Sequence, residues 1–375
     1  MEYTKLKYIN EYVSVSINPM KMPDTVFEMY SVPIYETGHP EYLRGNEIAS
    51  NKVIVRKNDI LLCKINPRIN RVWVVADESE HENIASSEWI VVRTSKYNPE
   101  FLAWYFRTPR FQRLMVSEVT GIGGSLTRAQ PKAVAEYPVP ILSRKEQDAI
   151  VRVLNRLHSV MDSRKKEMQK LDELIKARFV EMFGNEKNLM PISDICSIIT
   201  DGTHQPPKFR DTGIPFIFVS NITGDKVTYD AEKFIDQDTY DELIKRTPIE
   251  IGDVLLSTVG SYGHPAVVKS NKKFLFQRHI AYLKPRREII DSDYLHGAIL
   301  SPDAQRQIEE GVKGIAQKTL NLSEIKKMRI PVPDMNKQKE FATFSAQVDK
   351  SKAAVQKSLD ETQLLFNSLM QKYFG

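Results

Sequence analysis

The chain has 375 residues, 41% of them hydrophobic and 27% charged, and 53 basic against 48 acidic side chains give it a net charge of +5. This composition excludes an intrinsically disordered chain and leaves room for two or three domains, while the mild positive charge permits an acidic partner such as DNA without requiring one. Only two cysteines occur, Cys63 and Cys196, which is too few for a disulfide framework or a cysteine-rich zinc site.

The N-terminal stretch "MEYTKLKYINEY" is charged and has no apolar signal-peptide core. No stretch approaches the roughly 18 to 20 uninterrupted apolar residues that a membrane helix needs. We therefore expect a cytoplasmic protein.

Residues 1–140 are rich in short strand signals. The runs "NKVIVRKNDILLCKI", "RVWVVAD" and "SEWIVVRT" combine β-branched and aromatic residues between turn residues. A short helix is expected at "FLAWYFRTP", and a Pro-Val-Pro turn closes the region at residues 138–140. These patterns predict an α+β domain whose strands are mostly antiparallel.

A long helix is expected to follow, from Ser143 to Phe183, where neither proline nor glycine occurs. Its apolar residues recur at steps of three and four and trace one stripe along a helix. Ser143 and Glu146 have the spacing of a capping box, and Gly184 supplies a stop.

The second half of the chain follows the same plan. Strand signals occur at "GIPFIFVSNI", "GDVLLSTVG", "PAVVKS" and "HIAYLKP", and helices are expected near 238–246 and 294–310. A second proline-free and glycine-free helix is expected over 336–373. At 1.5 Å per residue, each helix of about 40 residues is roughly 60 Å long.

Two such helices, each with one apolar stripe, are expected to pack on each other as an antiparallel coiled coil. The domains predicted from these elements are 1–142 and 185–335, with helices over 143–184 and 336–375. In the alternative interpretation, each stripe packs against the neighbouring globular domain.

The two halves also share a sequence. "GIGGSLTRAQPKAVAEYPVP" from Gly121 and "GIAQKTLNLSEIKKMRIPVP" from Gly314 both run from a glycine through a basic segment to Pro-Val-Pro. The same offset of 193 aligns Gln112 with Gln305, an offset of 194 aligns "NDILLCK" with "GDVLLST", and an offset of 191 aligns "KEQ" with "NKQ". These ordered matches predict an internal duplication with pseudo-two-fold symmetry.

The chain resembles the specificity subunits of type I restriction-modification systems, the HsdS family, over essentially its whole length. The most specific stretches are "TDGTHQPPKF", "GDVLLSTVGSYG" and "GIAQKTLNLSEIKKMRIPVP", together with "YSVPIYETGHPEYLRG" in the first half. The doubled order of domain, Pro-Val-Pro, long helix and Phe-Gly is more specific than any of them.

This resemblance implies a DNA-binding subunit that is not itself an enzyme. Two target-recognition domains would each read half of a split DNA site, and the helices would set the spacing and dock two methyltransferase (modification) subunits. A restriction/translocase subunit would complete the complex. No cofactor is then expected on this chain, because S-adenosylmethionine, ATP and Mg²⁺ would be held by the partner subunits.

The expected DNA-contacting residues are basic, amide and hydroxyl side chains on turn-rich segments, because such groups bind phosphates and base edges. In the first half these candidates are Arg44, Asn46, Lys64, Asn66, Arg68, Asn70, Arg71, Ser125, Thr127, Arg128 and Lys132. In the second half they are Thr203, His204, Gln205, Lys208, Arg210, Ser261, Tyr262, His264, Lys313, Gln317 and Lys318. Each could instead be a solvated turn residue, and the glycine-led segments could be struts that join domain and helix.

Other functions fit the sequence less well. "INPR" at 65–68 lacks the second proline and the aromatic residue of the amino-methyltransferase motif, and no phosphate-binding G-x-x-x-x-G-K-[ST] loop occurs. The main alternative is a coiled-coil scaffold with two binding domains that do not bind DNA. Because the two sets of recognition loops differ, a DNA-binding chain is expected to read a non-palindromic site.

Overall fold

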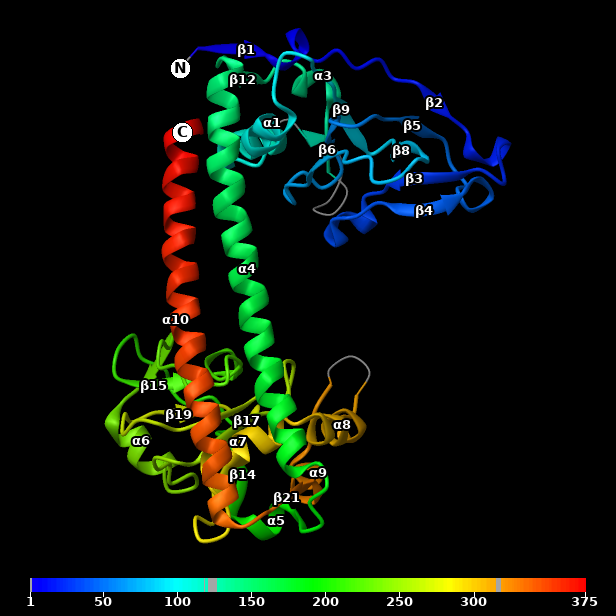
Figure 1. The fold of residues 1–375 in the computed structure, drawn as a ribbon. Helices are drawn as coiled ribbons and strands as arrows, with labels where there is room; N and C mark the ends of the chain where they lie inside the picture. Colours follow the sequence, from blue (N-terminus) through cyan, green and yellow to red (C-terminus); the bar gives the residue numbers. More distant parts are fainter. Residues whose placement is uncertain (1, 118, 121–126, 315–317) are drawn as a thin grey trace. The chain divides into compact units, whose positions relative to one another are not determined.

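The computed structural model describes residues 2–117, 119–120, 127–314 and 318–375 (Figure 1). The chain divides into two compact units. Unit 1 comprises Met1–Ser163 and Leu359–Gly375, and unit 2 comprises Arg164–Ser358. Each unit mixes helices and strands, so the predicted α+β mixture is confirmed. No described helix is both long enough and apolar enough to cross a membrane.

Unit 1 is built on a five-stranded sheet of order β2-β5-β8-β3-β4 and a three-stranded sheet of order β7-β6-β9, while β1 pairs with β12 and β10 with β11. Most pairs are antiparallel, but β3 and β8 run parallel. The strands are β1 Tyr3–Lys5, β2 Ser16–Ile17, β3 Val26–Tyr30, β4 Glu41–Arg44, β5 Lys52–Ile54, β6 Ile60–Cys63, β7 Val72–Val74, β8 Glu82–Ser86, β9 Trp89–Val92, β10 Val119–Thr120, β11 Arg128–Ala129 and β12 Pro138–Pro140. The short helices are α1 Pro99–Phe106, α2 Pro109–Ser117 and α3 Pro131–Val134, with 3₁₀ turns at Leu6–Tyr8, Pro19–Lys21, Pro33–Thr37 and Gly45–Glu47.

Unit 2 has a four-stranded sheet of order β14-β20-β17-β18 and a three-stranded sheet of order β16-β15-β19, and β13 pairs with β21. Here β15 and β19 are parallel. The strands are β13 Leu189–Pro191, β14 Cys196–Asp201, β15 Ile214–Ile217, β16 Lys233–Ile235, β17 Val254–Ser257, β18 Pro265–Val267, β19 Leu275–Phe276, β20 Ile280–Pro285 and β21 Arg329–Pro331. The short helices are α5 Ile192–Ile195, α6 Gln237–Leu243, α7 Ser292–Leu300, α8 Pro302–Gly311 and α9 Leu322–Lys327, with a 3₁₀ turn at Val219–Asn221.

The turn that leads into the central strand has the same construction in both units. Asn58 and Gly252 both adopt left-handed backbone conformations, with φ of 70° and 92°. The next residues, Asp59 and Asp253, are buried, and each carboxylate accepts a hydrogen bond of 2.8 Å from the backbone N–H three residues earlier. An asparagine and a glycine are the residue types that tolerate this conformation, which explains why "ND" in one half aligns with "GD" in the other.

A buried glutamine ties each long helix to its own unit. The Gln147 side-chain oxygen accepts a hydrogen bond from the Asn98 N–H at the start of α1, and the Gln338 oxygen accepts one from the Asp291 N–H at the start of α7, both at 2.8 Å. Each amide nitrogen donates to the carbonyl five residues before it, again at 2.8 Å. The satisfied amides therefore fix where each helix leaves its unit.

The Pro-Val-Pro segments were predicted as turns, and this prediction is wrong for residues 138–140, which form strand β12. Of residues 331–333, only Pro331 lies in a strand, at the end of β21, and each of the two strands has one partner. The Tyr137 carbonyl accepts from the Leu6 N–H and the Ile141 N–H donates to the Glu2 carbonyl, on either side of β1. Pro138 and Pro140, between these bonds, therefore face the outer edge. Proline is tolerated at such an edge, where no N–H is needed. The outward carbonyls accept hydroxyl hydrogen bonds from Tyr105 to Pro138 (2.5 Å) and from Tyr97 to Pro140 (3.1 Å).

The predicted long helices are α4, Arg144–Phe183, and α10, Met335–Phe374, each of 40 residues. The capping box before α4 is present: the Glu146 carboxylate accepts from the Ser143 N–H at 2.8 Å, and the Ser143 hydroxyl accepts from the Glu146 N–H at 3.3 Å. Unit 1 contains the first half of α4 and the last turns of α10. There, the Trp104 ring of α1 packs against both His158 of α4 and Phe366 of α10.

In unit 2 the remaining halves of α4 and α10 pair directly. Asp172 forms an ion pair with Lys352 at 2.5 Å, and Arg178 forms one with Glu340 at 3.2 Å. A later residue of α4 thus meets an earlier residue of α10, so these segments run antiparallel. The predicted helix over 294–310 is interrupted at Ser301, which caps α8 ahead of a proline and separates it from α7.

Gly297 of α7 allows α7 to pack closely against α10 in unit 2. A Cβ atom at this position would lie 2.4 Å from the Phe341 ring of α10, and Phe341 is fully buried. We expect Gly297→Ala to lower the free energy of unfolding by about 1–3 kcal/mol through overpacking, although alanine normally stabilises a helix by about 1 kcal/mol relative to glycine. Urea unfolding measures the change.

Gly224→Ala is the matched control, because no heavy atom lies within 4 Å of its added Cβ. It should leave the unfolding midpoint nearly unchanged. A Gly297→Ala variant more stable than the native chain would contradict the packing.

Candidate nucleic-acid interface

In unit 1 the structure joins two of the predicted DNA-contacting segments. The loop after β6 lies against residues 127–129, because the Asn66 N–H donates to the Thr127 carbonyl and the Ala129 N–H donates to the Lys64 carbonyl, both at 2.8 Å. The two segments are some 60 positions apart in the chain, yet backbone hydrogen bonds join them side by side. We call residues 64–71 with 127–128 the first loop cluster.

Two charged side chains of the first loop cluster contact the turn before β9. The Lys64 ammonium donates to the Ser87 carbonyl at 2.6 Å, and Arg128 forms an ion pair with Glu88 at 3.1 Å. Both contacts are exposed, so they are weak and can be exchanged for a phosphate. Arg68 is exposed at the tip of the loop.

Other predicted residues of the same cluster shape the loop. Asn66 turns the chain with a left-handed φ of 46°. The Asn70 amide donates to the Phe106 carbonyl at 3.3 Å, and the Arg71 side chain is only 18% exposed. These contacts give Asn70 and Arg71 a structural role in the described chain.

Unit 2 contains an equivalent arrangement, the second loop cluster, formed by residues 258–264 with 313 and 318–319. The Leu320 N–H donates to the Thr258 carbonyl at 2.8 Å, while Lys313 and Thr319 exchange two backbone hydrogen bonds of 2.9 and 3.0 Å. The glycine-led segment therefore meets the loop after β17, as its counterpart meets the loop after β6.

The tip of the second loop cluster has different chemistry. Ser261 is exposed beside Gly260, whose φ of 73° requires glycine-like freedom. The Tyr262 hydroxyl donates to the Glu309 carboxylate at 2.9 Å, and the Lys318 ammonium lies 6.0 Å from the Tyr262 ring centre. Serine, tyrosine and lysine thus occupy the place where unit 1 presents arginine and lysine.

Two glutamines that sequence reasoning did not assign to the interface hold these loops. Gln112 of α2 donates its amide N–H to the Arg68 carbonyl at 2.6 Å, and Gln305 of α8 donates to the Gly263 carbonyl at 3.0 Å. The offset of 193 that aligns the two glutamines was visible in the sequence, but their targets were not. Both act as positioning residues for the loop tips.

The segment 203–210 takes no part in these hydrogen bonds, and its charged side chains pair with residues on either side of it in the chain. His204 and Arg246 both contact the Asp201 carboxylate, at 2.8 and 2.5 Å. Arg210 forms an ion pair with Asp236 at 2.8 Å. Hydrogen bonds from Thr239 and then from Arg210 lower the pKa of that aspartate. These pairs compete with any contact to DNA.

The other predicted residues of unit 2 vary in position. Thr203 is held by a backbone hydrogen bond of 2.9 Å to β19, whereas Gln205 and Lys208 are exposed. The His264 ring lies 3.8 Å from Asp225 and lines a cavity of this unit.

The remaining predicted residues are not joined to either loop cluster. Arg44 and Asn46 lie at the end of β4 in the five-stranded sheet, and Lys132 lies on α3. Ser125 and Gln317 lie outside the described residues.

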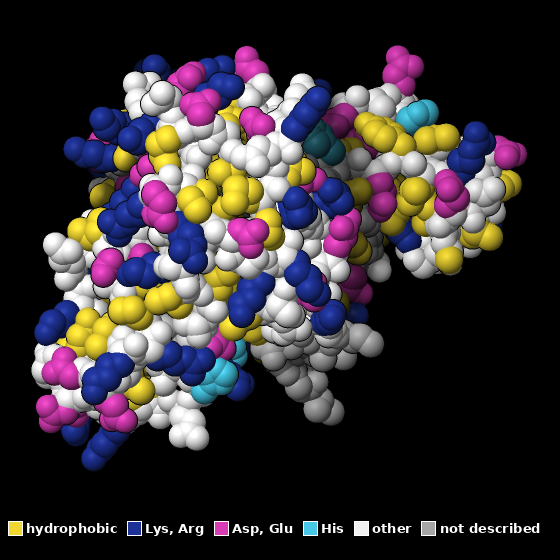
Figure 2. Space-filling view, turned by 90° about the horizontal axis from the view of Figure 1, so that it is seen from below, with side chains coloured by type: hydrophobic (Ala, Val, Ile, Leu, Met, Phe, Trp, Pro, Cys, Tyr) yellow, Lys and Arg dark blue, Asp and Glu magenta, His cyan; other side chains and the backbone are white. Residues whose placement is uncertain are grey.

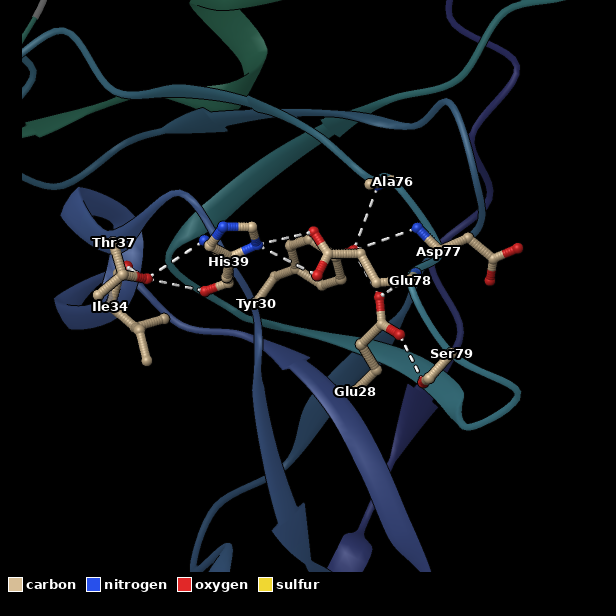
Figure 3. A network of polar contacts seen from close by, with 9 residues as sticks. All are labelled: Glu28, Tyr30, Ile34, Thr37, His39, Ala76, Asp77, Glu78 and Ser79. Carbon is tan, nitrogen blue, oxygen red and sulfur yellow. Dashed lines mark hydrogen bonds and ion pairs between the residues drawn. The ribbon is translucent and has the colours of Figure 1, made fainter. Parts of the chain in front are cut away.

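A rigid acidic loop marks another part of unit 1 (Figure 3). The buried Glu28 carboxylate accepts hydrogen bonds from the Tyr30 hydroxyl (2.7 Å), the Glu78 N–H (3.0 Å) and the Ser79 hydroxyl (2.6 Å). Burial opposes ionisation, but the hydrogen bonds from Ser79 and Tyr30 outweigh it and lower the pKa of Glu28. The Tyr30 hydroxyl in turn accepts from the Asp77 N–H at 3.3 Å.

This acidic loop carries four carboxylates between positions 77 and 82. The negative charge of this loop makes it an unfavourable surface for phosphates. Elsewhere, on the face seen in Figure 2, Lys and Arg side chains are interspersed with Asp and Glu. Charge alone therefore does not single out one surface on this face.

Comparisons with known proteins agree on one family. A family model described as the type I restriction modification DNA specificity domain matches residues 185–362. The EcoBI specificity subunit of Escherichia coli is 22% identical over 315 residues, which cover 75% of this chain and 65% of the relative. The MjaVIII specificity subunit of Methanocaldococcus jannaschii is 18% identical over 367 residues, 88% of this chain and 82% of the relative. The chain thus spans just under two thirds of the E. coli relative.

Two solved structures share the fold. A chain from a study of complex assembly and conformational transition of the type I R-M system has a TM-score of 0.59 at 18% identity, covering 100% of this chain and 97% of that one. The S subunit of a type I restriction-modification system from M. genitalium has a TM-score of 0.53 at 12% identity, covering 100% and 96%. The solved structures thus show a shared fold, while the match over residues 185–362 and the curated relatives support a specificity subunit of the type I restriction-modification family.

Proposed function

We propose that the chain recognises a bipartite DNA site, with each unit reading one half through its loop cluster. The observation that carries this proposal is the repeated joining of a loop after the central strand to a basic, glycine-led segment, once in each unit. Basic and hydroxyl side chains on such loops suit phosphate contacts, and arginine suits guanine edges. The equivalent glutamine and turn contacts in both units support an internal duplication.

The half-sites are proposed to differ. The first loop cluster presents Arg68, Lys64 and Arg128, whereas the second presents Ser261, Tyr262 and Lys318. Different hydrogen-bonding groups at equivalent places select different bases, so the complete site is non-palindromic.

The long helices are proposed to form a continuous antiparallel coiled coil that spaces the two readers. A 40-residue helix is about 60 Å long, enough to span half-sites one DNA turn, roughly 34–36 Å, apart. The ion pairs of unit 2 and the aromatic contacts of unit 1 support this pairing.

The same helices are proposed to dock two methyltransferase subunits. In unit 1 they expose four aliphatic side chains, Val153, Val160, Leu364 and Leu365, the last two at 70% and 50%. Exposed aliphatic surface on a helix pair suits a protein partner. The partners, including a restriction/translocase subunit, would supply S-adenosylmethionine, ATP and Mg²⁺, and this chain would contribute recognition without catalysis.

Methylome sequencing of a host that carries the complete operon tests the proposal most directly. A split, asymmetric methylated site is expected. Replacing residues 1–142 with another recognition domain should change only one half of it. A coiled-coil scaffold that does not bind DNA would leave the methylome unaffected by the replacement and would not retard duplex DNA in a gel.

Arg68 of the first loop cluster provides a local test. Arg68→Ala is expected to weaken binding of the complex to its site by about 1–3 kcal/mol if the side chain reads a base. Gel-shift titrations at several salt concentrations separate this loss from a phosphate contact, which would instead reduce the salt dependence. Lys57→Ala, an exposed lysine outside the cluster, is the control and should bind like the native chain.

The positioning glutamines test whether the loop clusters act in separate halves. Gln112→Met keeps a similar volume but cannot donate to the Arg68 carbonyl, so tolerance of mismatches should increase in one half-site only. Gln305→Met should relax the other half-site. Sequence-resolved binding assays read both effects, and relaxation of the same half by both variants would contradict the assignment.

The docking surface makes a separate prediction. Leu364→Lys combined with Leu365→Lys should reduce co-purification of the methyltransferase subunit at least tenfold without lowering the unfolding midpoint, because both side chains are already exposed. Leu189→Lys, an exposed leucine on β13, is the matched control. Unchanged co-purification of the double variant would place the partner elsewhere.

A further inference from the structure

Unit 2 contains a cavity of about 640 Å³ between α4, α7, α10, β18 and the loop 224–229. The cavity exists because α10 turns small side chains toward it, at Ala342, Ser345, Ala346 and Ala353. Its size falls in the range of small-molecule sites. It is separate from the second loop cluster except for His264, which lines its wall.

Three buried polar atoms in this cavity lack a hydrogen-bond partner: Asp225 Oδ1, Tyr229 Oη and His296 Nε2. Nine such atoms occur in the described part of the chain, so a third of them line one cavity. Buried polar groups are normally paired, because leaving one unpaired costs about 1–3 kcal/mol. Their convergence indicates that a polar ligand completes the site.

Asp225 sets the main requirement on that ligand. The ring nitrogen Nδ1 of His264 is 3.8 Å from Asp225 Oδ1, which is too far for a hydrogen bond. The residue is held in a left-handed conformation, with φ of 57°. A carboxylate can only accept, so the ligand must present an N–H or O–H donor here.

Tyr229 and His296 can adapt to the rest of the ligand. A phenol hydroxyl both donates and accepts, and a neutral imidazole nitrogen does either, depending on the tautomer. Burial lowers the pKa of His296, which keeps the ring neutral near pH 7. The aliphatic side chains of Ile175, Val227 and Leu300 line the walls and suit the faces of a ring.

The lysines of the cavity are unequally paired. Lys352 pairs with Asp172, and Lys269 pairs with Asp293. The remaining lining lysines, at positions 176, 226 and 350, are exposed and form no ion pair with any described residue. Lys352 also lies 3.9 Å from Asp349, so Asp172 and Asp349 share one lysine. The lining carries five lysines against four aspartates, and the three rim lysines without ion pairs favour an anionic group.

We propose that this cavity binds a mononucleotide whose base carries an exocyclic amino group. The amino group donates to Asp225, the ring lies between the aliphatic walls within reach of Tyr229 and His296, and the phosphate is held by the rim lysines. Exocyclic amino groups occur on adenine, cytosine and guanine and are the groups from which carboxylates accept. The proposal stands independently of DNA recognition by the loop clusters.

The test uses a matched pair of probes on the full-length chain. Cytidine and uridine monophosphate differ at C4, an amino group against a carbonyl, and at N3, which accepts in cytidine but in uridine carries a hydrogen flanked by two carbonyls. Isothermal titration should show at least tenfold tighter binding of cytidine monophosphate than of uridine monophosphate or inorganic phosphate. Asp225→Asn should remove this preference, because its amide no longer offers a carboxylate, while Asp230→Asn in the same loop should keep it.

A second variant keeps the test informative if Asp225→Asn does not fold. Lys226→Ala should weaken both nucleotides by a similar factor and leave their ratio unchanged. Equal affinity for the two nucleotides, a preference that survives Asp225→Asn, or no binding at millimolar concentration would overturn the proposal. So would a crystal soaked with cytidine monophosphate that shows only water bridging the three polar atoms.

Discussion

The buried amide of Gln147, and its counterpart Gln338, is the constraint on which the architecture of each unit depends. In each unit the glutamine oxygen accepts a hydrogen bond at the start of a short helix. The amide nitrogen of the same side chain donates to a carbonyl in the segment that leads into the long helix. No hydrophobic contact could impose the same direction, because apolar packing tolerates rotation and slippage whereas two hydrogen bonds do not. The helix axis and the globular part of each unit are thereby fixed to each other.

The loop clusters are also held by hydrogen bonds within each unit. The loop after the central strand is held by backbone hydrogen bonds to the glycine-led segment and by a glutamine of α2 or α8. Side chains at the tip then vary without disturbing the frame, which is how one scaffold can serve two different recognition tasks.

Much of this was predictable from the sequence. The α4 and α10 boundaries, the capping box and the repeat offsets followed from 3.6-residue periodicity and aligned dipeptides, which are local signals. The joining of Lys64 to Ala129, and of Thr258 to Leu320, was not predictable, because backbone pairing across long separations leaves no local pattern. The Pro-Val-Pro prediction failed for the same reason. Proline is typical of turns, but it also occurs on the unpaired edge of a strand, and the sequence does not show which edges are unpaired.

The candidate site divides in the same way. Residue type and turn context selected Arg68, Ser261 and Lys318, which the structure leaves at accessible tips. They could not exclude Asn70 or Arg71, whose partners come from distant elements, or His204, which pairs with Asp201 three positions earlier. The cavity beside α10 could not be predicted from the sequence, because it is the space left between packed elements where α10 carries small side chains.

The proline-flanked strand β12 has a consequence for solution behaviour. Its outer edge offers no amide hydrogen at Pro138 or Pro140, and the carbonyl oxygens there are already occupied by tyrosine hydroxyls. A neighbouring molecule therefore finds neither donors nor vacant acceptors along which to extend the sheet. This edge of the chain is therefore protected against self-association into ordered aggregates.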